Sequence, residues 1–193
     1  MKRFEIKKQN ILVMYIIILL VQDKYNFYYP TIPVYPNNHD ELEVVKEMIG
    51  VRTEDDVKIF LKTDISVCYL FVDHTTETIS ELRSTTNSHR ILIFVKFFKN
   101  IINRARPYQI DESIDDLKSV TSHTPAYPAG HAFQAYYLAR VLSIRYPDKK
   151  DKWDSLAKQC DLVRVKAGLH YPSDGAFSKK LVDYFFDFLY DSK

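Results

Sequence analysis

The sequence predicts an all-α protein, a single domain built as a bundle of about six helices. Of its 193 residues, 46% are hydrophobic and only four are glycine, a composition that favours a compact helical protein over a turn-rich β fold. Several stretches carry apolar residues at intervals of three or four, which is the spacing of one helix face. The length is sufficient for one domain with a substantial core and a short preceding segment.

Composition also limits the classes of partner. The net charge of +2 at pH 7 is too balanced for a nucleic-acid-binding protein, and no basic run with interleaved aromatic residues marks such a surface. Cys68 and Cys160 lie in apolar periodic stretches, where we expect reduced, buried cysteines; a single disulfide is the alternative if the protein is secreted. No cluster of cysteine and histidine has the spacing of a zinc site.

Residues 1–22 form an apolar N-terminal segment that has three alternative interpretations. Residues 1–10 are basic on balance, and residues 11–21 are apolar over about half the length that spans a bilayer as a helix. The segment is similar to a signal peptide but has no small-residue cleavage site, so an uncleaved membrane anchor and a core element are the other two interpretations. Residues 11–22 could attach the protein to a membrane, and we expect either this membrane-associated location or a secreted or lumenal one over the cytoplasm.

A proline-rich stretch separates this segment from the domain. Residues 23–40 carry Pro30, Pro33 and Pro36 followed by an asparagine pair, which predicts an extended Pro/Tyr/Asn-rich linker. We expect the helical domain to occupy residues 41–193.

In the first half of the domain, the pattern predicts two long helices around a polar stretch. Thr53, with acidic residues after it, indicates a helix start, and the helix should run to about Phe71. Residues 73–87 are polar and predict a short helix with loops. An apolar helix that ends at Pro107 follows, and its buried stripe should consist of positions 91, 94, 95, 98, 102 and 105.

Three further helices are expected after a long connection. Residues 108–127 lack a sustained apolar period, so we expect a long connection there. Such a connection could lie over a functional site and shape its substrate pocket. The next helices should run from His131 to Tyr146, from Asp151 to just before Gly168, and over residues 177–190 with a cap at Ser173 or Asp174.

The first candidate site lies where the helix from Asp151 ends. Arg164 falls on the buried face of that helix, and a buried arginine is costly unless it meets an anion, either a carboxylate or a bound phosphate. His170 follows at a turn, and Asp174 is placed to accept a hydrogen bond from one ring nitrogen of His170, which leaves the other nitrogen free to act. A structural ion pair with a core histidine is the alternative interpretation.

Two further stretches carry candidate residues. Lys99 and Arg106 are seven residues apart, so on one helix they would point the same way, about 10 Å apart along the axis, and could converge on one group. The alternative is that Arg104 and Arg106 are cations suited to a helix C-terminus, an explanation that fits Lys99 less well. His131 follows Gly130 at a helix start, where free amides favour an anion and an imidazolium could protonate a leaving oxygen; a plain surface histidine is the alternative.

The three stretches together resemble the type 2 phosphatidic acid phosphatase and vanadium haloperoxidase superfamily over about residues 54–190. The family pattern is Lys, six residues, Arg-Pro; then Pro-Ser-Gly-His; then Ser-Arg, five residues, His, three residues, Asp. This chain keeps every spacing, with Lys99, Arg106-Pro107, Pro128-Ala129-Gly130-His131, Arg164, His170 and Asp174. Two positions depart from the pattern, because Ala129 and Val163 stand where the family has serine.

The resemblance implies a helical bundle of the acid phosphatase/vanadium haloperoxidase type and a metal-independent phosphatase. The enzyme would hydrolyse phosphomonoesters or lipid phosphates through a phosphohistidine intermediate, with no cofactor. Its catalytic residues would be His170, His131 and Asp174, and its phosphate-binding residues would be Lys99, Arg106, Arg164, Gly130 and Ala129.

Two alternatives to a phosphatase stay open. The family also builds vanadate-dependent haloperoxidases from the same residues, and a non-catalytic phosphate-binding relative is the other possibility. The apolar runs inside the domain are short and interrupted by Lys96, Lys99 and Arg140, which resembles the soluble acid-phosphatase branch. The expected partner is a phosphorylated small molecule or lipid phosphate, and the sequence does not determine the oligomeric state.

Overall fold

The computed structural model describes residue 17, residues 24–26 and residues 34–190. The predicted N-terminal segment lies outside the described residues except for Ile17, and so do residue 23 and residues 27–33 of the predicted linker. The described part of the chain contains α-helices, short 3-10 helices and no strand, which confirms the predicted all-α class. None of the helices in this part is both long and apolar enough to cross a bilayer.

The described part of the chain has eight α-helices and three 3-10 helices. The sequence predicted about six helices. In the first half the elements are α2 (Asn38–Gly50), α3 (Glu54–Ile65), η1 (Val67–Leu70), η2 (Val72–His74), α4 (Ile79–Thr86), α5 (His89–Ile102) and α6 (Pro107–Ile110). In the second half they are α7 (Gly130–Arg145), η3 (Pro147–Lys149), α8 (Lys150–Lys166) and α9 (Pro172–Leu189).

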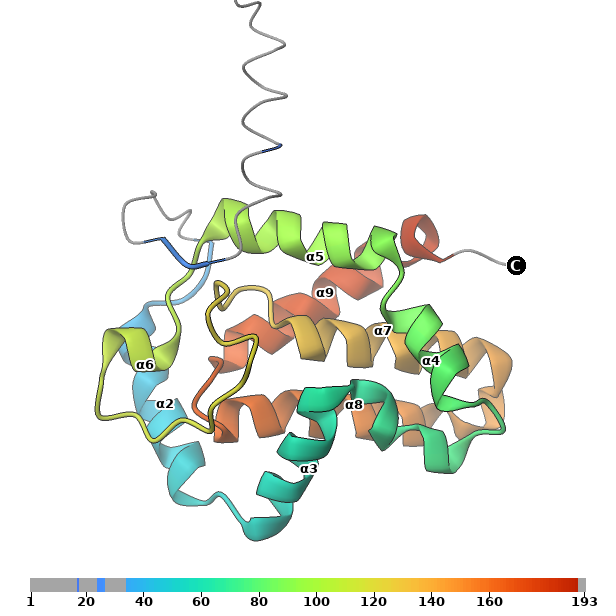
Figure 1. The fold of residues 1–193 in the computed structure, drawn as a ribbon, viewed down its shortest axis with the longest axis horizontal. Coiled ribbons are helices and arrows are strands. Elements are labelled where there is room, and N and C mark those ends of the chain that lie inside the picture. The colour runs from blue at the N-terminus through green and yellow to red at the C-terminus, as the bar shows by residue number, and fades with distance from the viewer. Residues whose placement is uncertain (1–16, 18–23, 27–33, 191–193) are drawn as a thin grey trace, which may run out of the picture.

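Helix α7 is the centre of the bundle, and two hydrophobic clusters lie on its two sides. Figure 1 shows α7 and α9 between α5 and α8. One cluster joins α7 to α8, α4 and η1 around Leu138 and Trp153; the other joins α7 to α5 and α9 around Phe133 and Phe186. Because both sides of α7 are buried, its first turn, which carries His131, is held firmly at one end of the bundle.

Both cysteines belong to the first of these clusters. Cys68 and Cys160 are buried and free, as predicted.

Two helices end earlier than the sequence predicts. Helix α3 stops at Ile65 and not near Phe71, because Ser66 has an extended backbone and its side chain caps the 3-10 turn that follows. Helix α5 stops at Ile102, because Asn103 takes the left-handed conformation with φ 49°. Position 105 and Arg106 therefore lie beyond this helix, so Lys99 and Arg106 do not share a helix face as predicted.

Two other helices begin earlier than predicted. Helix α9 starts at Pro172, five residues before the predicted start, because Tyr171 is its N-cap and Asp174 accepts the Tyr171 amide within the first turn. Helix α2 starts at Asn38, within the predicted linker, and the Asn37 side chain caps it.

Candidate active site

His170 and Asp174 form a buried pair between α8 and α9. The chain turns after α8 at Gly168, whose φ of 70° favours glycine, and it then enters α9. His170 lies in this turn, and its Nδ1 is 3.0 Å from Oδ2 of Asp174. The same oxygen accepts the Tyr171 amide at 2.9 Å, so the carboxylate is fixed by the first turn of α9. The hydrogen bond predicted between these two side chains is therefore present.

Arg106 determines the tautomer of His170. Its Nη1 lies 3.1 Å from Nε2 of His170, and a guanidinium can only donate hydrogen bonds. Nε2 must therefore be the acceptor, which places the ring proton on Nδ1 and directs it to Asp174. Burial and the charges of Arg106 and Lys99 lower the pKa of His170 well below its usual range, which keeps the ring neutral. Nε2 thus has its lone pair directed to Arg106, and both side chains line the cavity.

Arg106 is held by the long connection that precedes α7. Its Nε donates to the Thr124 carbonyl at 2.7 Å, and its Nη1 donates to the Leu169 carbonyl at 3.0 Å. Burial lowers the pKa of Arg106 to about 10, so it stays protonated at neutral pH. The connection therefore lies over the site and orients one of its cations, as expected of residues 108–127.

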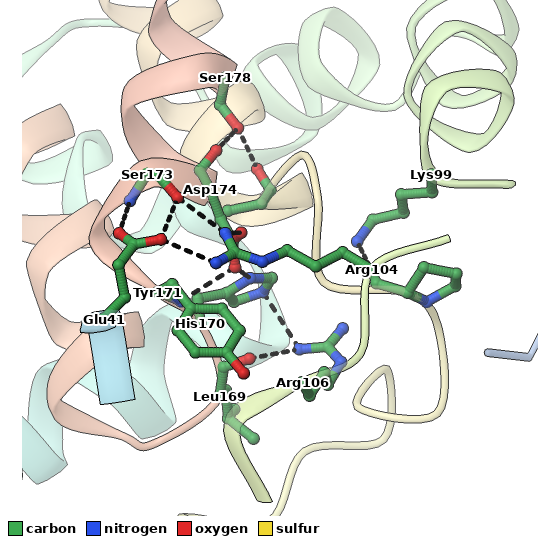
Figure 2. A network of polar contacts seen from close by, with 12 residues as sticks. Glu41, Lys99, Arg104, Arg106, Leu169, His170, Tyr171, Ser173, Asp174 and Ser178 are labelled. Carbon is green, nitrogen blue, oxygen red and sulfur yellow. Dashed lines mark hydrogen bonds and ion pairs between the residues drawn. The ribbon is translucent and has the colours of Figure 1, made fainter. Parts of the chain in front are cut away.

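Lys99 approaches the same region from the last turn of α5. The side chain is buried, and its Nζ donates to the Pro125 carbonyl (Figure 2). Burial, together with the charge of Arg106, lowers the pKa of Lys99 well below its usual range. An anion in the cavity would offset both effects.

His131 and Gly130 form the first turn of α7 and line the cavity. Burial and the charges of Arg164 and His170 lower the pKa of His131 well below its usual range. Ala129, directly before them, is fully buried, and its amide donates to the Asp174 carbonyl at 3.2 Å. Ala129 is not among the residues that line the cavity, and the phosphate contact expected of it stays a prediction.

Arg164 is buried, as predicted, and the anion that it meets is a carboxylate. Its Nη1 lies 2.7 Å from Oδ1 of Asp64, and its Nη2 donates to the Thr63 hydroxyl at 2.7 Å. Asp64 lines the cavity, whereas Arg164 does not. The structure therefore brings Lys99 and Arg106 to the cavity but holds Arg164 behind Asp64.

Arg104 and Glu41 are residues whose importance the sequence reasoning missed. Figure 2 shows Arg104 between Asp174 and Glu41. Its Nη1 is 2.6 Å from Oδ1 of Asp174, its Nη2 is 2.7 Å from Oε2 of Glu41, and its guanidinium lies 3.9 Å from the centre of the Tyr171 ring. Asn103 was a sequence signal for the position of Arg104. Asparagine favours the left-handed conformation directly after a helix, so it indicates that Arg104 lies outside the helix.

These side chains surround a cavity of about 490 Å³ with a polar floor and an apolar wall. The floor carries Lys99, Arg106, His131, His170, Asp64 and Thr124. The apolar wall carries Ile65, Ile91, Leu92, Val95 and Val120. Such a site can bind an anion at the floor beside an imidazole nucleophile, with an apolar group against the wall. Within the described residues, no group of three or more His, Cys, Asp or Glu side chains is arranged to hold a metal ion.

Comparison with known proteins finds a family model that matches part of this chain. Residues 88–179, which contain all three sequence blocks, match the family model of the PAP2 superfamily. The crystal structure of the first transmembrane PAP2 type phosphatidylglycerolphosphate phosphatase from Bacillus subtilis is similar at 17% sequence identity and a TM-score of 0.49, and the match covers 97% of this chain and 100% of that one. No curated protein matches the chain. The chain is therefore similar to the type 2 phosphatidic acid phosphatase (PAP2) superfamily over the region that contains its three blocks, the family that these blocks predicted.

Proposed function

We propose that the protein is a phosphatase that hydrolyses a phosphomonoester or lipid phosphate through a phosphohistidine intermediate and needs no metal ion. The match of residues 88–179 to the PAP2 superfamily model supports a phosphatase. The observation that carries the mechanism is the orientation of His170, whose Nδ1–H is directed to Asp174 while Nε2 accepts a hydrogen bond from Arg106. An imidazole held in this way has its nucleophilic nitrogen beside a cation that can bind the phosphoryl group.

In the first step, the Arg106 hydrogen bond passes from Nε2 of His170 to a phosphate oxygen, and the freed lone pair of Nε2 attacks phosphorus. The bond between phosphorus and the ester oxygen breaks. Arg106 and Lys99 neutralise charge on the phosphoryl oxygens, and Asp174 stabilises the positive ring that forms. His131 gives its proton to the departing alkoxide. The negative charge of the bound phosphate raises the pKa values of His131 and Lys99, so both are protonated when substrate is present.

In the second step, water attacks the phosphohistidine. His131, now neutral, takes a proton from that water, and the bond between phosphorus and Nε2 breaks. Inorganic phosphate leaves, and both histidines return to their starting state. The same imidazole therefore acts first as acid and then as base.

The cavity wall supports a substrate with an apolar group next to its phosphate. Ile65 and Val120 are 72% and 82% exposed, so they offer apolar surface at the cavity to a leaving group. A phosphorylated lipid or an aromatic phosphate fits this surface better than a sugar phosphate does.

The test is phosphate release from para-nitrophenyl phosphate, phosphatidate and an isoprenyl diphosphate in EDTA. We expect turnover by the wild type, none by His170→Ala, and full activity in the control His89→Ala, which changes an exposed histidine on α5 that does not line the cavity. A protein quenched during turnover should carry acid-labile phosphate on His170. Activity that survives His170→Ala would contradict the phosphohistidine scheme. Bromide oxidation that requires vanadate, with no phosphate release, would contradict the phosphatase.

A further inference from the structure

Asp64 places a carboxylate in a cavity whose other charged groups are suited to an anion. It is the penultimate residue of α3, and its side chain is 16% exposed. Its Oδ1 accepts hydrogen bonds from Nη1 of Arg164 and from the Ser119 hydroxyl, both at 2.7 Å, and lies 3.9 Å from Nε2 of His131. Among the described residues that line the cavity, Asp64 is the one carboxylate.

The position of this carboxylate determines what Arg164 can bind. Arg164 is 1% exposed, and both of its terminal nitrogens are engaged, one by Asp64 and the other by Thr63. The carboxylate therefore lies between a guanidinium and the cavity, on the side from which a phosphate would approach. Asp174, by contrast, does not line the cavity, and its carboxylate is paired with Arg104.

We propose that Asp64 is an internal counter-ion of the anion site: in the empty site its carboxylate occupies Arg164 and competes with phosphate oxygens for that side chain. This inference rests on the proposed function, in which the cavity binds phosphate. When phosphate binds, an oxygen of the phosphate replaces Oδ1 on Arg164, and the Asp64 side chain turns away from it. Asp64 thereby weakens phosphate binding and determines how readily the site retains inorganic phosphate after hydrolysis.

A purely structural ion pair makes the opposite prediction. If Asp64 only supports Arg164, its loss leaves a buried guanidinium without a counter-charge, and phosphate binding stays the same or weakens as the site loosens. If Asp64 competes, its loss frees Arg164 and removes a negative charge from beside the bound phosphate, so phosphate binds more tightly. The direction of the change separates the two roles.

The experiment measures binding of inorganic phosphate to the full-length protein by isothermal titration calorimetry. Asp64→Asn is the main variant, because its side-chain oxygen can still accept hydrogen bonds from Arg164 and Ser119. We expect its Kd for phosphate to fall about tenfold, the size of a change in one charge contact. The control is Asp55→Asn on the same helix, which removes the same charge from an exposed side chain and should change Kd less than about twofold.

A second variant keeps the inference testable if Asp64→Asn unfolds. Ser119→Ala removes one of the two donors that hold the carboxylate, so displacement of Asp64 becomes easier and phosphate should again bind more tightly. Thermal melting verifies that each variant is folded. Binding by Asp64→Asn where the wild type shows none would support the inference. An unchanged or higher Kd in folded Asp64→Asn, or no phosphate binding in either protein, would overturn it.

The outcome is independent of turnover. Tighter phosphate binding by Asp64→Asn in a protein that hydrolyses no ester would support the counter-ion and contradict the proposed phosphatase. Hydrolysis that depends on His170, together with unchanged phosphate binding in Asp64→Asn, would contradict the counter-ion alone.

Discussion

Nη1 of Arg104 donates to Oδ1 of Asp174 at 2.6 Å, and both side chains are fully buried. The other oxygen of Asp174 accepts from His170, so Arg104 holds the carboxylate that in turn orients the imidazole. Burial raises the pKa of Asp174, and the charge of Arg104 opposes this shift by favouring the ionised carboxylate. Arg104 is therefore a positioning residue that does not touch the cavity.

Replacing Arg104 with methionine should damage both stability and catalysis. The substitution leaves Asp174 and Glu41 without their common counter-charge, and removal of one partner of a buried ion pair typically costs about 3–5 kcal/mol. Urea unfolding should measure that loss. In protein that remains folded, kcat should fall far more than KM rises, because phosphate does not contact Arg104. Arg104→Lys, which keeps the charge, should recover part of both losses; equal stability of the methionine variant and the wild type would contradict this role.

Asp161 on α8 should make stability depend on pH. Burial raises its pKa from 3.8 to about 6, while a 2.9 Å hydrogen bond from Tyr136 opposes the shift. The folded state holds the proton more tightly than the unfolded chain, so this contribution is complete below about pH 4 and is lost as pH rises through 6. Asp161→Asn stays neutral, so at pH 7 it should be more stable than the wild type by up to about 3 kcal/mol.

Urea unfolding at pH 4 and at pH 7 measures this difference. The advantage of Asp161→Asn should shrink at the lower pH, where wild-type Asp161 is protonated as well. A difference in unfolding free energy that is the same at both pH values would show that Asp161 does not titrate in this range.

Gly175 should tolerate no side chain while Asp161 is present. A Cβ built at Gly175 would lie 1.8 Å from Oδ1 of Asp161, so either α9 or the carboxylate must move. We expect Gly175→Ala to cost about 1–3 kcal/mol in unfolding free energy, the usual range for overpacking. In an Asp161→Ala background the obstructing oxygens are gone, and the same substitution should cost much less. Additive losses in this double-mutant cycle would contradict direct contact.

The role of His131 predicts a dependence on the leaving group. Para-nitrophenolate is stable without a proton, whereas the alkoxide of an alkyl phosphate needs one as it departs. His131→Ala should therefore lower kcat/KM for an alkyl phosphate by about 10²–10⁴ and for para-nitrophenyl phosphate by much less. Equal losses with the two substrates would assign His131 to phosphate binding and not to proton transfer.

Local patterns predicted the all-α class and the central helix well. The predicted span from His131 to Tyr146 matches α7 (Gly130–Arg145) to within one residue, because Gly130 and Pro147 mark its ends. The block spacing likewise picked out five residues that meet at one cavity, namely Lys99, Arg106, Gly130, His131 and His170. The predicted end of α5 was wrong. The apolar period continues through position 105, whereas the backbone leaves the helix at Asn103.

The partners of the buried arginines could not be predicted from local patterns. Glu41 and Arg104 are 63 residues apart, and Asp64 and Arg164 are 100 apart. A capping residue leaves its trace within one helical turn, but these pairs form only when distant helices pack. The acidic residues on α2 and α3 therefore looked like ordinary residues of solvated helix faces.

The position of Glu41 and Asp64 in the chain has a consequence for biosynthesis. Both acidic residues are made before the arginines that they bind, and His170 and Asp174 are made after Arg104 and Arg164. On the ribosome, α2 and α3 must therefore wait for partners that emerge 63 and 100 residues later. The polar interior of the site can close only when the last helix has left the exit tunnel, so an incomplete nascent chain has no working site.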